Sequence, residues 1–345
     1  MPRDPDIEPY WLLPVWQTSG LISKVPVLKS NWTFQAGLQA RRMVANLSRQ
    51  VKLDALFFHT QVTAVLSPDW IGRFPTVVSL DATPLQYDSL GDFYNHGSGP
   101  EWLERLKWRL TRNCFQKASH LVTWSEWARQ GLVEYDTEPE KATVIPPGVD
   151  TEAWARTSPR QPDNEVVKIL FVGGNLERKG GLLLLNAFRS LRRMDSMPDI
   201  ELHLVTKDVV SAETGLFVYN DMEPNSARLK QLYHACDIFC LPTFGDCLPM
   251  VLSEAGAAGL PVVSTRVAAI PEIVQDGKTG LLIPPGDEAA LTTALSRLAA
   301  DPALRQCQGR EAADLVGRQF DAGKNAARLL DLLKQTINEA AAKTV

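Results

Sequence analysis

The stretch "VKILFVGGNLERKGGLLLLNAF", residues 167–188, decides the fold class. It begins with an apolar run that ends at Gly173 and Gly174, and it continues into a leucine-rich run with a polar start. An apolar run bounded by turn residues predicts a buried strand, and the leucine-rich run predicts a helix. A buried strand followed by a helix is the repeating unit of a parallel sheet whose two faces are covered by helices.

The same alternation recurs along the whole chain. Further strands of the second half are predicted at 200–207, 237–243, 261–265 and 280–287, and helices at 226–236, 249–259 and 288–301. Strands of the first half are predicted at 53–60, 75–84, 120–125 and 141–148, and a long amphipathic helix at 101–118. We therefore expect an α/β protein with two Rossmann-like, doubly wound parallel-sheet domains.

The chain length and the tryptophan distribution also indicate two domains. A chain of 345 residues exceeds the size of one ordinary domain. All nine tryptophans lie between Trp11 and Trp154. A segment rich in proline, glycine and polar residues, as linkers are, surrounds Trp154. The predicted parts are an N-terminal domain at 1–150, a linker at 151–165, a second domain at 166–322, and a C-terminal helix at 323–345 that can cross back to the first domain.

Composition excludes several classes of protein. Hydrophobic residues make up 45% and charged residues 22% of the chain, which is ordinary for a globular enzyme, and the net charge of −4 gives no reason to expect nucleic acid as a partner. No apolar run approaches the roughly 20 residues that span a bilayer, and "MPRDPDIEPY" does not resemble a signal peptide. The five scattered cysteines fit a reducing compartment, so a cytoplasmic location is expected.

Polar residues and glycines follow the predicted strands of the second half. Ligands of doubly wound sheets collect at the carboxyl ends of the strands. The residues there are Gly173, Gly174, Asn175, Arg178, Lys179, Thr206, Lys207, Gly245 and Asp246. Glycines, cations and a helix N-terminus together favour a diphosphate-binding loop, although neither GxGxxG nor GxxxxGK[ST] is present.

Three blocks of sequence carry a resemblance to a known family. They are "TVIPPGVDTEAW" (143–154), "FVGGNLERKGG" with "LLNAF" (171–188), and the long block from Leu232 to Asp287 that contains "PTFGDCLPMVLSEAGAAG". In order and spacing they resemble retaining GT-B glycosyltransferases of the family-4 type (glycosyl transferases group 1) over nearly all of residues 75–320. The resemblance implies metal-independent, retaining transfer of a hexose from a nucleotide diphosphate sugar to an acceptor hydroxyl. It also implies an active site in a cleft between the domains, no cofactor and no metal.

The resemblance also assigns roles on the donor side. Glu254 would accept hydrogen bonds from the ribose hydroxyls, and Asp246, in place of the family's usual glutamate, would hold the sugar. Arg178 and Lys179 would contact the diphosphate, because Gly174 stands where the family has an arginine. The other donor-binding candidates are Gly173, Gly174, Asn175, Lys207, Gly245, Cys247, Leu248 and Pro249.

The first half departs more from the family. Leu80–Asp81 stands where the family often has a His–Asp pair, so Asp81 is the candidate for contacting the acceptor or the donor sugar. His59 and His96 are acceptor-side candidates, and the alternative for each is a structural histidine. The family's opening strand–loop–helix unit has no counterpart, and residues 7–20 resemble material from the second strand of that unit onward, so a shortened N-terminal domain is expected.

The sequence is compatible with several partners and several functions. The basic, aromatic helix 101–117 can make peripheral membrane contact, or it can pack its apolar face on the sheet with solvated arginines outside. A sugar, a lipid-linked molecule or a small molecule could be the acceptor. The alternatives to transfer are a non-catalytic or weakly active nucleotide-sugar-binding protein and a GT-B sugar-nucleotide epimerase.

Overall fold

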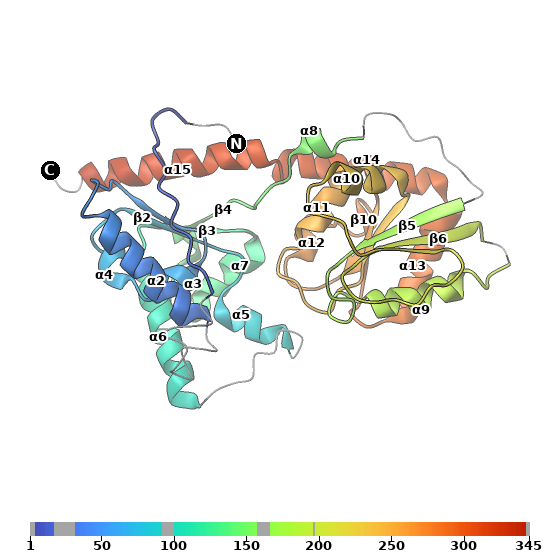
Figure 1. Cartoon of the computed structure of the whole chain (residues 1–345), viewed down its shortest axis with the longest axis horizontal. Helices are drawn as coiled ribbons and strands as arrows, with labels where there is room; N and C mark the ends of the chain where they lie inside the picture. The colour runs from blue at the N-terminus through green and yellow to red at the C-terminus, as the bar shows by residue number, and fades with distance from the viewer. Residues whose placement is uncertain (1–3, 17–31, 92–99, 157–165, 196, 343–345) are drawn as a thin grey trace. The chain divides into compact units, whose positions relative to one another are not determined.

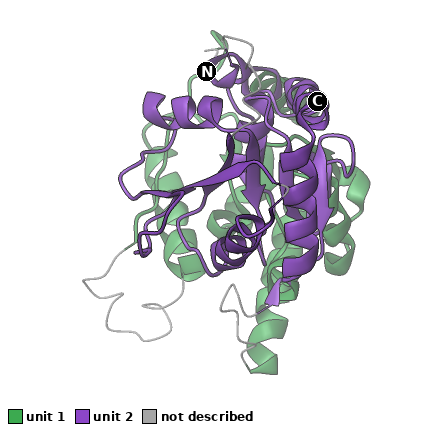
Figure 2. Ribbon diagram, turned by 90° about the vertical axis from the view of Figure 1, so that its right-hand side faces the viewer, with its two compact units in different colours: residues 1–89, 96–146, 326–345 green, residues 90–95, 147–325 purple. Residues whose placement is uncertain are grey.

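The computed structural model describes residues 4–16, 32–91, 100–156, 166–195 and 197–342. The chain divides into two compact units (Figures 1 and 2). Unit 1 comprises residues 1–89, 96–146 and 326–345, and unit 2 comprises residues 90–95 and 147–325. Each unit contains one parallel sheet, which confirms the predicted α/β class with two parallel-sheet domains.

The sheet of unit 1 has four parallel strands in the order β1-β2-β3-β4. They are β1 (Leu56–Phe58), β2 (Thr76–Leu80), β3 (His120–Thr123) and β4 (Ala142–Val144), all within predicted strands. Successive side chains of a strand alternate between the faces of a sheet. Val78, Leu80 and Leu121 accordingly pack in the core cluster with α2 (Trp32–Leu47) and α6 (Glu101–Lys117), whereas Val77 and Val122 belong to a second cluster.

The second cluster is completed by the C-terminal helix α15 (Ala322–Ala342), which lies along this sheet (Figure 1). Its leucines at 329, 332 and 333 form one apolar stripe, since residues three or four apart share a face of a helix. Arg328 Nη2 donates to the carbonyl oxygen of Val144 over 2.9 Å. The helix begins in unit 2 and continues in unit 1 from residue 326 onward (Figure 2).

The start of the chain differs from its prediction. Residues 4–16 form neither helix nor strand, so the resemblance of 7–20 to strand material is wrong for residues 7–16. Pro9 and Pro14 interrupt this segment, and proline has no amide hydrogen for a strand ladder. The segment is instead held to α15 by Lys334, whose ammonium pairs with Asp4 at 2.8 Å and Asp6 at 2.9 Å.

The remaining elements of unit 1 are short. They connect the strands of the sheet. They are α3 (Gln61–Ala64), α4 (Pro68–Ile71), α5 (Pro84–Ser89), α7 (Glu126–Gln130) and the 3₁₀ turns η3 (Gly131–Tyr135) and η4 (Pro139–Lys141).

The sheet of unit 2 has six parallel strands in the order β10-β9-β8-β5-β6-β7. They are β5 (Val166–Val172), β6 (Asp199–Val205), β7 (Leu216–Tyr219), β8 (Ile238–Leu241), β9 (Val262–Thr265) and β10 (Gly280–Ile283). Strands β8 and β9 are buried along their whole length, as their continuous apolar sequences predicted. Strand β7 was not predicted, because this edge strand is partly exposed and lacks such an apolar run.

Helices cover both faces of this sheet (Figure 1). On one face lie α9 (Gly181–Leu191) and α13 (Glu288–Ala300), and on the other lie α10 (Ala227–Ala235), α11 (Met250–Ala257) and α14 (Pro302–Gln319). The side chains of Ser226, Asp287 and Asp301 accept hydrogen bonds from backbone amides and so cap α10, α13 and α14. The short helices are α8 (Thr151–Trp154) and α12 (Ile270–Ile273).

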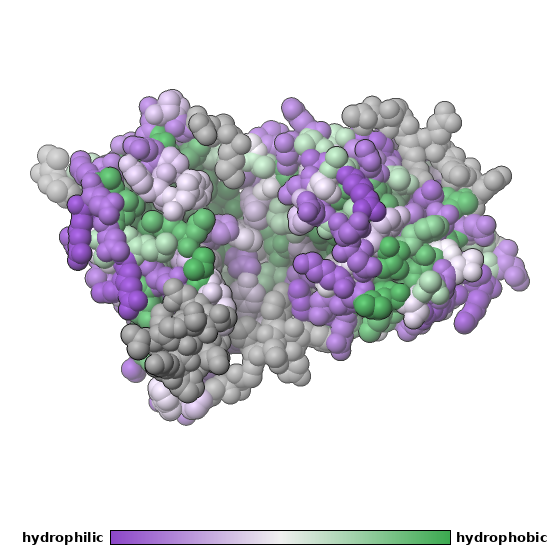
Figure 3. Space-filling model, in the orientation of Figure 1, coloured by the Kyte–Doolittle hydropathy of each residue, from purple (hydrophilic) through white to green (hydrophobic). Residues whose placement is uncertain are grey.

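The predicted linker, 151–165, starts with α8. Trp154 of this helix is buried in unit 2, and its carbonyl oxygen lies 2.9 Å from Nε2 of His234. Residues 157–165 lie outside the described residues. On the visible face of each unit, polar and apolar side chains are mixed (Figure 3).

Candidate active site

The strand order of unit 2 fixes where a ligand can bind. From β5 the chain adds β6 and β7 on one side, and it then returns to add β8, β9 and β10 on the other. The order therefore reverses between β5 and β8, and doubly wound sheets bind ligands at such a point, beyond the carboxyl ends of the strands. The loop after β5 (173–180) and the loop after β8 (242–249) meet there.

Gly180 allows these two loops to touch. Its φ is +72°, in the left-handed region, and an added Cβ would lie 2.0 Å from the carbonyl oxygen of Pro242. Only glycine fits both conditions without strain. The amide of Phe244 also donates to the carbonyl oxygen of Arg178 over 3.0 Å. The backbone contact brings the side chains at the two loops within reach of each other.

Two cations of the first loop surround one carboxylate of the second. Lys179 Nζ lies 2.5 Å from Asp246 Oδ2, and Arg178 Nη1 lies 3.6 Å from Asp246 Oδ1. The hydroxyl of Thr243, which is fully buried, donates to the same Oδ2 over 3.1 Å. Arg178 Nη1 also donates to the carbonyl oxygen of Gly245 over 2.8 Å. The formal charges of these three side chains sum to +1, and a diphosphate is a ligand of the opposite sign.

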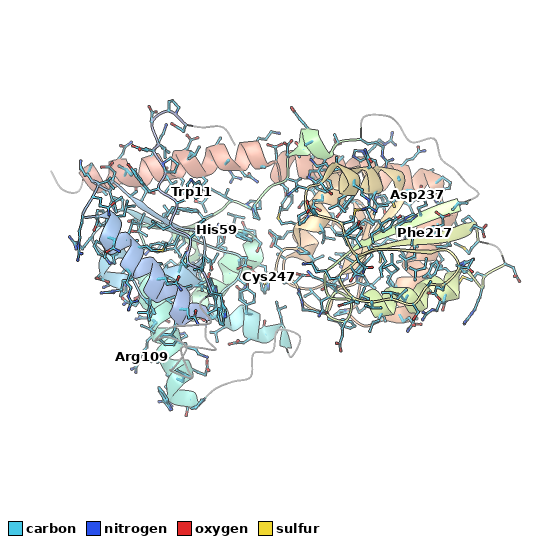
Figure 4. The ribbon with its side chains drawn as sticks, in the orientation of Figure 1. Trp11, His59, Arg109, Phe217, Asp237 and Cys247 are labelled. Carbon is cyan, nitrogen blue, oxygen red and sulfur yellow. The ribbon has the colours of Figure 1, made fainter. Side chains whose placement is uncertain are left out.

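Burial changes the acid–base behaviour of this cluster. Removal from water lowers the pKa of Lys179, because it penalises the charged ammonium, while the carboxylate of Asp246 acts in the opposite direction. Both side chains of this pair are largely buried. Figure 4 marks Cys247, the residue that follows Asp246, in unit 2.

Glu254 lies on α11, the helix that follows the second loop. Burial raises the pKa of its carboxyl group, and the hydroxyl of Tyr233, which donates to Glu254 Oε2 over 3.0 Å, partly opposes this rise. Tyr233 is itself fixed, because its ring stacks on Phe239 at 5.5 Å between centroids and meets the edge of Trp154 at 5.0 Å. Glu254 is therefore a carboxylate held in one orientation by a rigid, fully buried phenol.

The other predicted donor-side residues have different surroundings. Position 173 needs glycine, because an added Cβ would lie 2.8 Å from the ring of Phe171. At Gly174 an added Cβ would meet nothing within 4 Å. Asn175 serves the turn, because its Oδ1 accepts from the amide of Arg178 over 2.8 Å. Lys207 follows β6 and is exposed. Cys247, Leu248 and Pro249 are buried in the turn before α11.

Unit 1 has its own group of side chains at the carboxyl ends of its strands. Asp81 follows β2, and its Oδ2 accepts a short hydrogen bond from the hydroxyl of Tyr87. His59 follows β1 and its ring lies 5.5 Å from the ring of Trp124, which follows β3 (Figure 4 marks His59). The structure thus places Asp81 and His59 at the carboxyl ends of neighbouring strands of one sheet. His96 lies outside the described residues.

The basic helix predicted at 101–117 is α6. Its Arg105, Lys107 and Arg112 form ion pairs with Glu101, Glu104 and Asp136. Phe115 is buried in the core cluster and Trp108 packs against it, whereas Trp102 is 68% exposed. These contacts match the packing alternative, and membrane contact stays a prediction.

Sequence reasoning missed four of the residues that build these sites. Trp124 directly follows β3 and Thr243 lies two residues after β8, so their positions at strand ends were a signal that could have found them. Tyr233 and Tyr87 lie inside helices, where no sequence signal separates them from core aromatics.

No group of three or more His, Cys, Asp or Glu side chains is arranged to hold a metal ion in the described parts of the chain. Likewise, the helices that the structure describes include none long and apolar enough to cross a bilayer.

Comparisons with known proteins agree with this geometry. Residues 3–153 match the family model "Glycosyltransferase Family 4", and residues 167–301 match "Glycosyl transferases group 1". The chain is 28% identical over 248 residues to a D-inositol 3-phosphate glycosyltransferase of Corynebacterium kroppenstedtii, a match covering 64% of this chain and 54% of that protein. The chain thus spans about half the length of the curated relatives it matches.

Solved structures show the same fold. Sucrose-phosphate synthase from Thermosynechococcus elongatus superimposes with a TM-score of 0.70 at 18% identity, over 88% of this chain and 78% of that one. Anabaena HepE in complex with UDP-glucose gives a TM-score of 0.66 at 18% identity, over 86% and 82%. The two family models together cover most of the sequence, and each corresponds to one of the parallel-sheet domains. The chain therefore belongs to the GT-B glycosyltransferases of the family-4 type.

Proposed function

We propose that this protein transfers a hexose from a nucleotide diphosphate sugar to an acceptor hydroxyl, with retention of configuration and without a metal ion. The observation that carries the proposal is the cluster of Arg178, Lys179 and Asp246 at the switch point of the unit 2 sheet. Glu254 lies on α11, the helix that follows the loop of Asp246. HepE, whose fold this chain shares, was solved in complex with UDP-glucose.

The residues suggest how the bonds would be exchanged. The bond between the anomeric carbon and the diphosphate oxygen breaks, and a bond from the same carbon to the acceptor oxygen forms on the same face. The proton of the acceptor hydroxyl passes to the departing diphosphate. Negative charge grows on that diphosphate as the bond breaks, and Arg178 and Lys179 would stabilise it without a metal.

The carboxylates would orient the donor. Ionised Glu254 accepts hydrogen bonds from ribose hydroxyls through Oε1, while Tyr233 holds Oε2. Asp246 pairs with the cations in the structure, and a bound diphosphate would take over those cations and leave Asp246 to accept from the sugar hydroxyls. In unit 1, Asp81 and His59 would contact the acceptor.

Thermal-shift screening tests the donor part of the proposal. A ligand that binds only the folded protein raises its melting temperature by mass action, so UDP-, GDP- and ADP-sugars can be ranked without an acceptor. We expect one nucleotide series to stabilise the protein. No stabilisation by any of the three would contradict the proposal.

A transfer assay then separates the candidate functions. Glycoside formation supports transfer. Binding without turnover across a broad panel of acceptors supports the non-catalytic alternative, and interconversion of the sugar nucleotide supports the epimerase. The name of the corynebacterial relative gives that protein a phosphorylated acceptor, so inositol phosphates belong in the acceptor panel.

The pH dependence of donor binding should be bell-shaped. Ribose binding needs ionised Glu254, whose pKa is raised, so affinity falls with decreasing pH earlier than for an exposed glutamate. Diphosphate binding needs charged Lys179, whose pKa is lowered, so affinity also falls with rising pH earlier than for an exposed lysine. Isothermal titration calorimetry with UDP across the pH range measures both limbs.

The Tyr233→Phe variant should move only the acid limb. It removes the hydrogen bond that favours ionised Glu254, so the pKa of Glu254 rises further and the acid limb moves to higher pH. Affinity for UDP near neutral pH should fall on the order of tenfold, because one hydrogen bond to a charged group contributes at least about 1.5 kcal/mol. A variant with lower affinity but an unmoved acid limb would show that Tyr233 acts only through packing.

The Gly174→Arg variant should strengthen binding of the diphosphate. The site has room for a side chain at this position, and a third cation would add to the net charge of Arg178, Lys179 and Asp246. We expect UDP to bind about three- to tenfold more tightly at low salt, a gain of roughly 1 kcal/mol. Gly174→Gln, of similar length but uncharged, is the control and should not reproduce the gain.

A further inference from the structure

His59 and Trp124 form a ring pair at the carboxyl edge of the unit 1 sheet. They follow β1 and β3, the two strands that flank β2, and their ring centroids lie 5.5 Å apart at an interplanar angle of 41°. Neighbouring strands are about 4.8 Å apart, so the two side chains must reach toward each other across the end of β2. Asp81 is the residue at that end.

The indole of Trp124 is held in place. Its Nε1 donates to Ser79 Oγ over 2.9 Å, and its amide donates to the carbonyl oxygen of Leu80 over 3.0 Å. Trp124 is half-buried and His59 is exposed, and neither side chain is part of the apolar clusters of unit 1. A fixed ring that reaches solvent offers contact area at little cost in conformational entropy.

The carboxylate beside the rings is also fixed. Asp81 is half-buried, and Tyr87 donates a hydrogen bond to its Oδ2. An ionised carboxylate only accepts hydrogen bonds, so its ligand must present donors. It also repels a phosphate placed next to it, because like charges brought together cost free energy.

We propose that Trp124, His59 and Asp81 form an acceptor subsite for an uncharged pyranose sugar, an inference that rests on the proposed transfer function. A pyranose presents a face of C–H groups and a rim of hydroxyl donors. The indole and the imidazole pack against the C–H face, and Asp81 accepts from the hydroxyls at the rim. The subsite selects against acceptors that carry a phosphate on the ring edge facing Asp81.

Binding of simple sugars to the full-length protein tests this subsite. Saturation-transfer NMR with methyl glucopyranoside, methyl mannopyranoside, glucose 6-phosphate and mannose 6-phosphate, with and without UDP, needs no knowledge of the natural acceptor. We expect a methyl pyranoside to bind at least about fivefold more tightly than its phosphorylated counterpart. Trp124→Ala should weaken that binding about tenfold, whereas Trp124→Phe, which keeps a ring, should retain most of it.

Two further variants keep the test decisive. Trp102→Ala removes an exposed tryptophan of α6 and should leave sugar binding unchanged. Asp81→Asn removes the charge with little change in shape, and it should reduce the preference for the unphosphorylated sugar even if Trp124→Ala fails to fold. Equal binding of the phosphorylated sugars, or unchanged binding by folded Trp124→Ala, would overturn the subsite.

Calorimetry with UDP on the same samples separates this inference from the proposed function. Loss of sugar binding with intact UDP binding in Trp124→Ala assigns the effect to unit 1. Absence of UDP binding in the unaltered protein would instead contradict the donor site in unit 2.

Discussion

Replacing Lys179 with alanine is expected to lower the turnover number on the order of 100- to 1,000-fold, the usual effect of deleting one group that stabilises charge in a transition state. Lys179 is largely buried, and its ammonium lies 2.5 Å from Asp246. Without it, the formal charges of the remaining Arg178 and Asp246 sum to zero in place of +1. The growing charge on the diphosphate then has one cation in place of two. Initial rates at saturating donor measure the effect.

The matched control for this variant is Lys278→Ala. Lys278 is an exposed lysine of the same unit, and it lies 3.7 Å from Glu311 in a surface ion pair. Surface pairs contribute little, so both stability and turnover should stay close to those of the unaltered protein. Lys179→Met preserves most of the side-chain volume and separates loss of charge from loss of packing. Turnover within a factor of a few of the original in folded Lys179→Met would contradict the role of the ammonium.

Replacing Glu254 with alanine is expected to weaken nucleotide binding on the order of 100-fold. Two ribose hydroxyls donating to a carboxylate contribute roughly 3 kcal/mol together, and each 1.4 kcal/mol is a factor of ten. The change also leaves the buried hydroxyl of Tyr233 without the partner that it has at 3.0 Å. Calorimetry with UDP measures the affinity.

Graded substitutions at this position make the test sharper. Glu254→Gln keeps an acceptor oxygen for Tyr233 and for one hydroxyl, so its affinity should lie between those of the unaltered protein and of Glu254→Ala. Glu311→Ala, which removes a partly exposed glutamate of α14, should bind UDP as the unaltered protein does. Unchanged affinity in Glu254→Ala would show that the ribose is held elsewhere.

The predicted elements show where local sequence is sufficient and where it fails. Continuous apolar runs identified the buried strands β5, β8 and β9, because burial on both faces leaves no alternation in the sequence. The edge strand β7 is partly exposed and was missed for the same reason. Residues 7–16 were expected to contain strand material, but Pro9 and Pro14 cannot donate to a ladder, and the segment forms neither helix nor strand.

In the candidate sites, too, local sequence identified some residues and could not identify others. The strand-end argument selected Arg178, Lys179 and Asp246 from two distant segments without showing that they touch. Asp81 and His59 were selected through the family resemblance, and Trp124, which follows a strand of the same sheet, was overlooked. Tyr233 could not be found at all, because an aromatic residue inside an amphipathic helix has the same sequence signature whether it packs in a core or orients a carboxylate.

The sequence by itself determined which segments become buried strands and which residues lie at their carboxyl ends, since both follow from the local order of apolar and turn residues. Only the tertiary structure decided that β5 and β8 are neighbours, because strand order depends on crossovers that no local pattern records. That order brings Lys179 and Asp246, 67 residues apart in sequence, into direct contact. In unit 1, the strand order β1-β2-β3 places Trp124 and His59 across the end of β2, so the charge of the proposed donor site and the shape of the proposed acceptor subsite are both properties of the folded sheets.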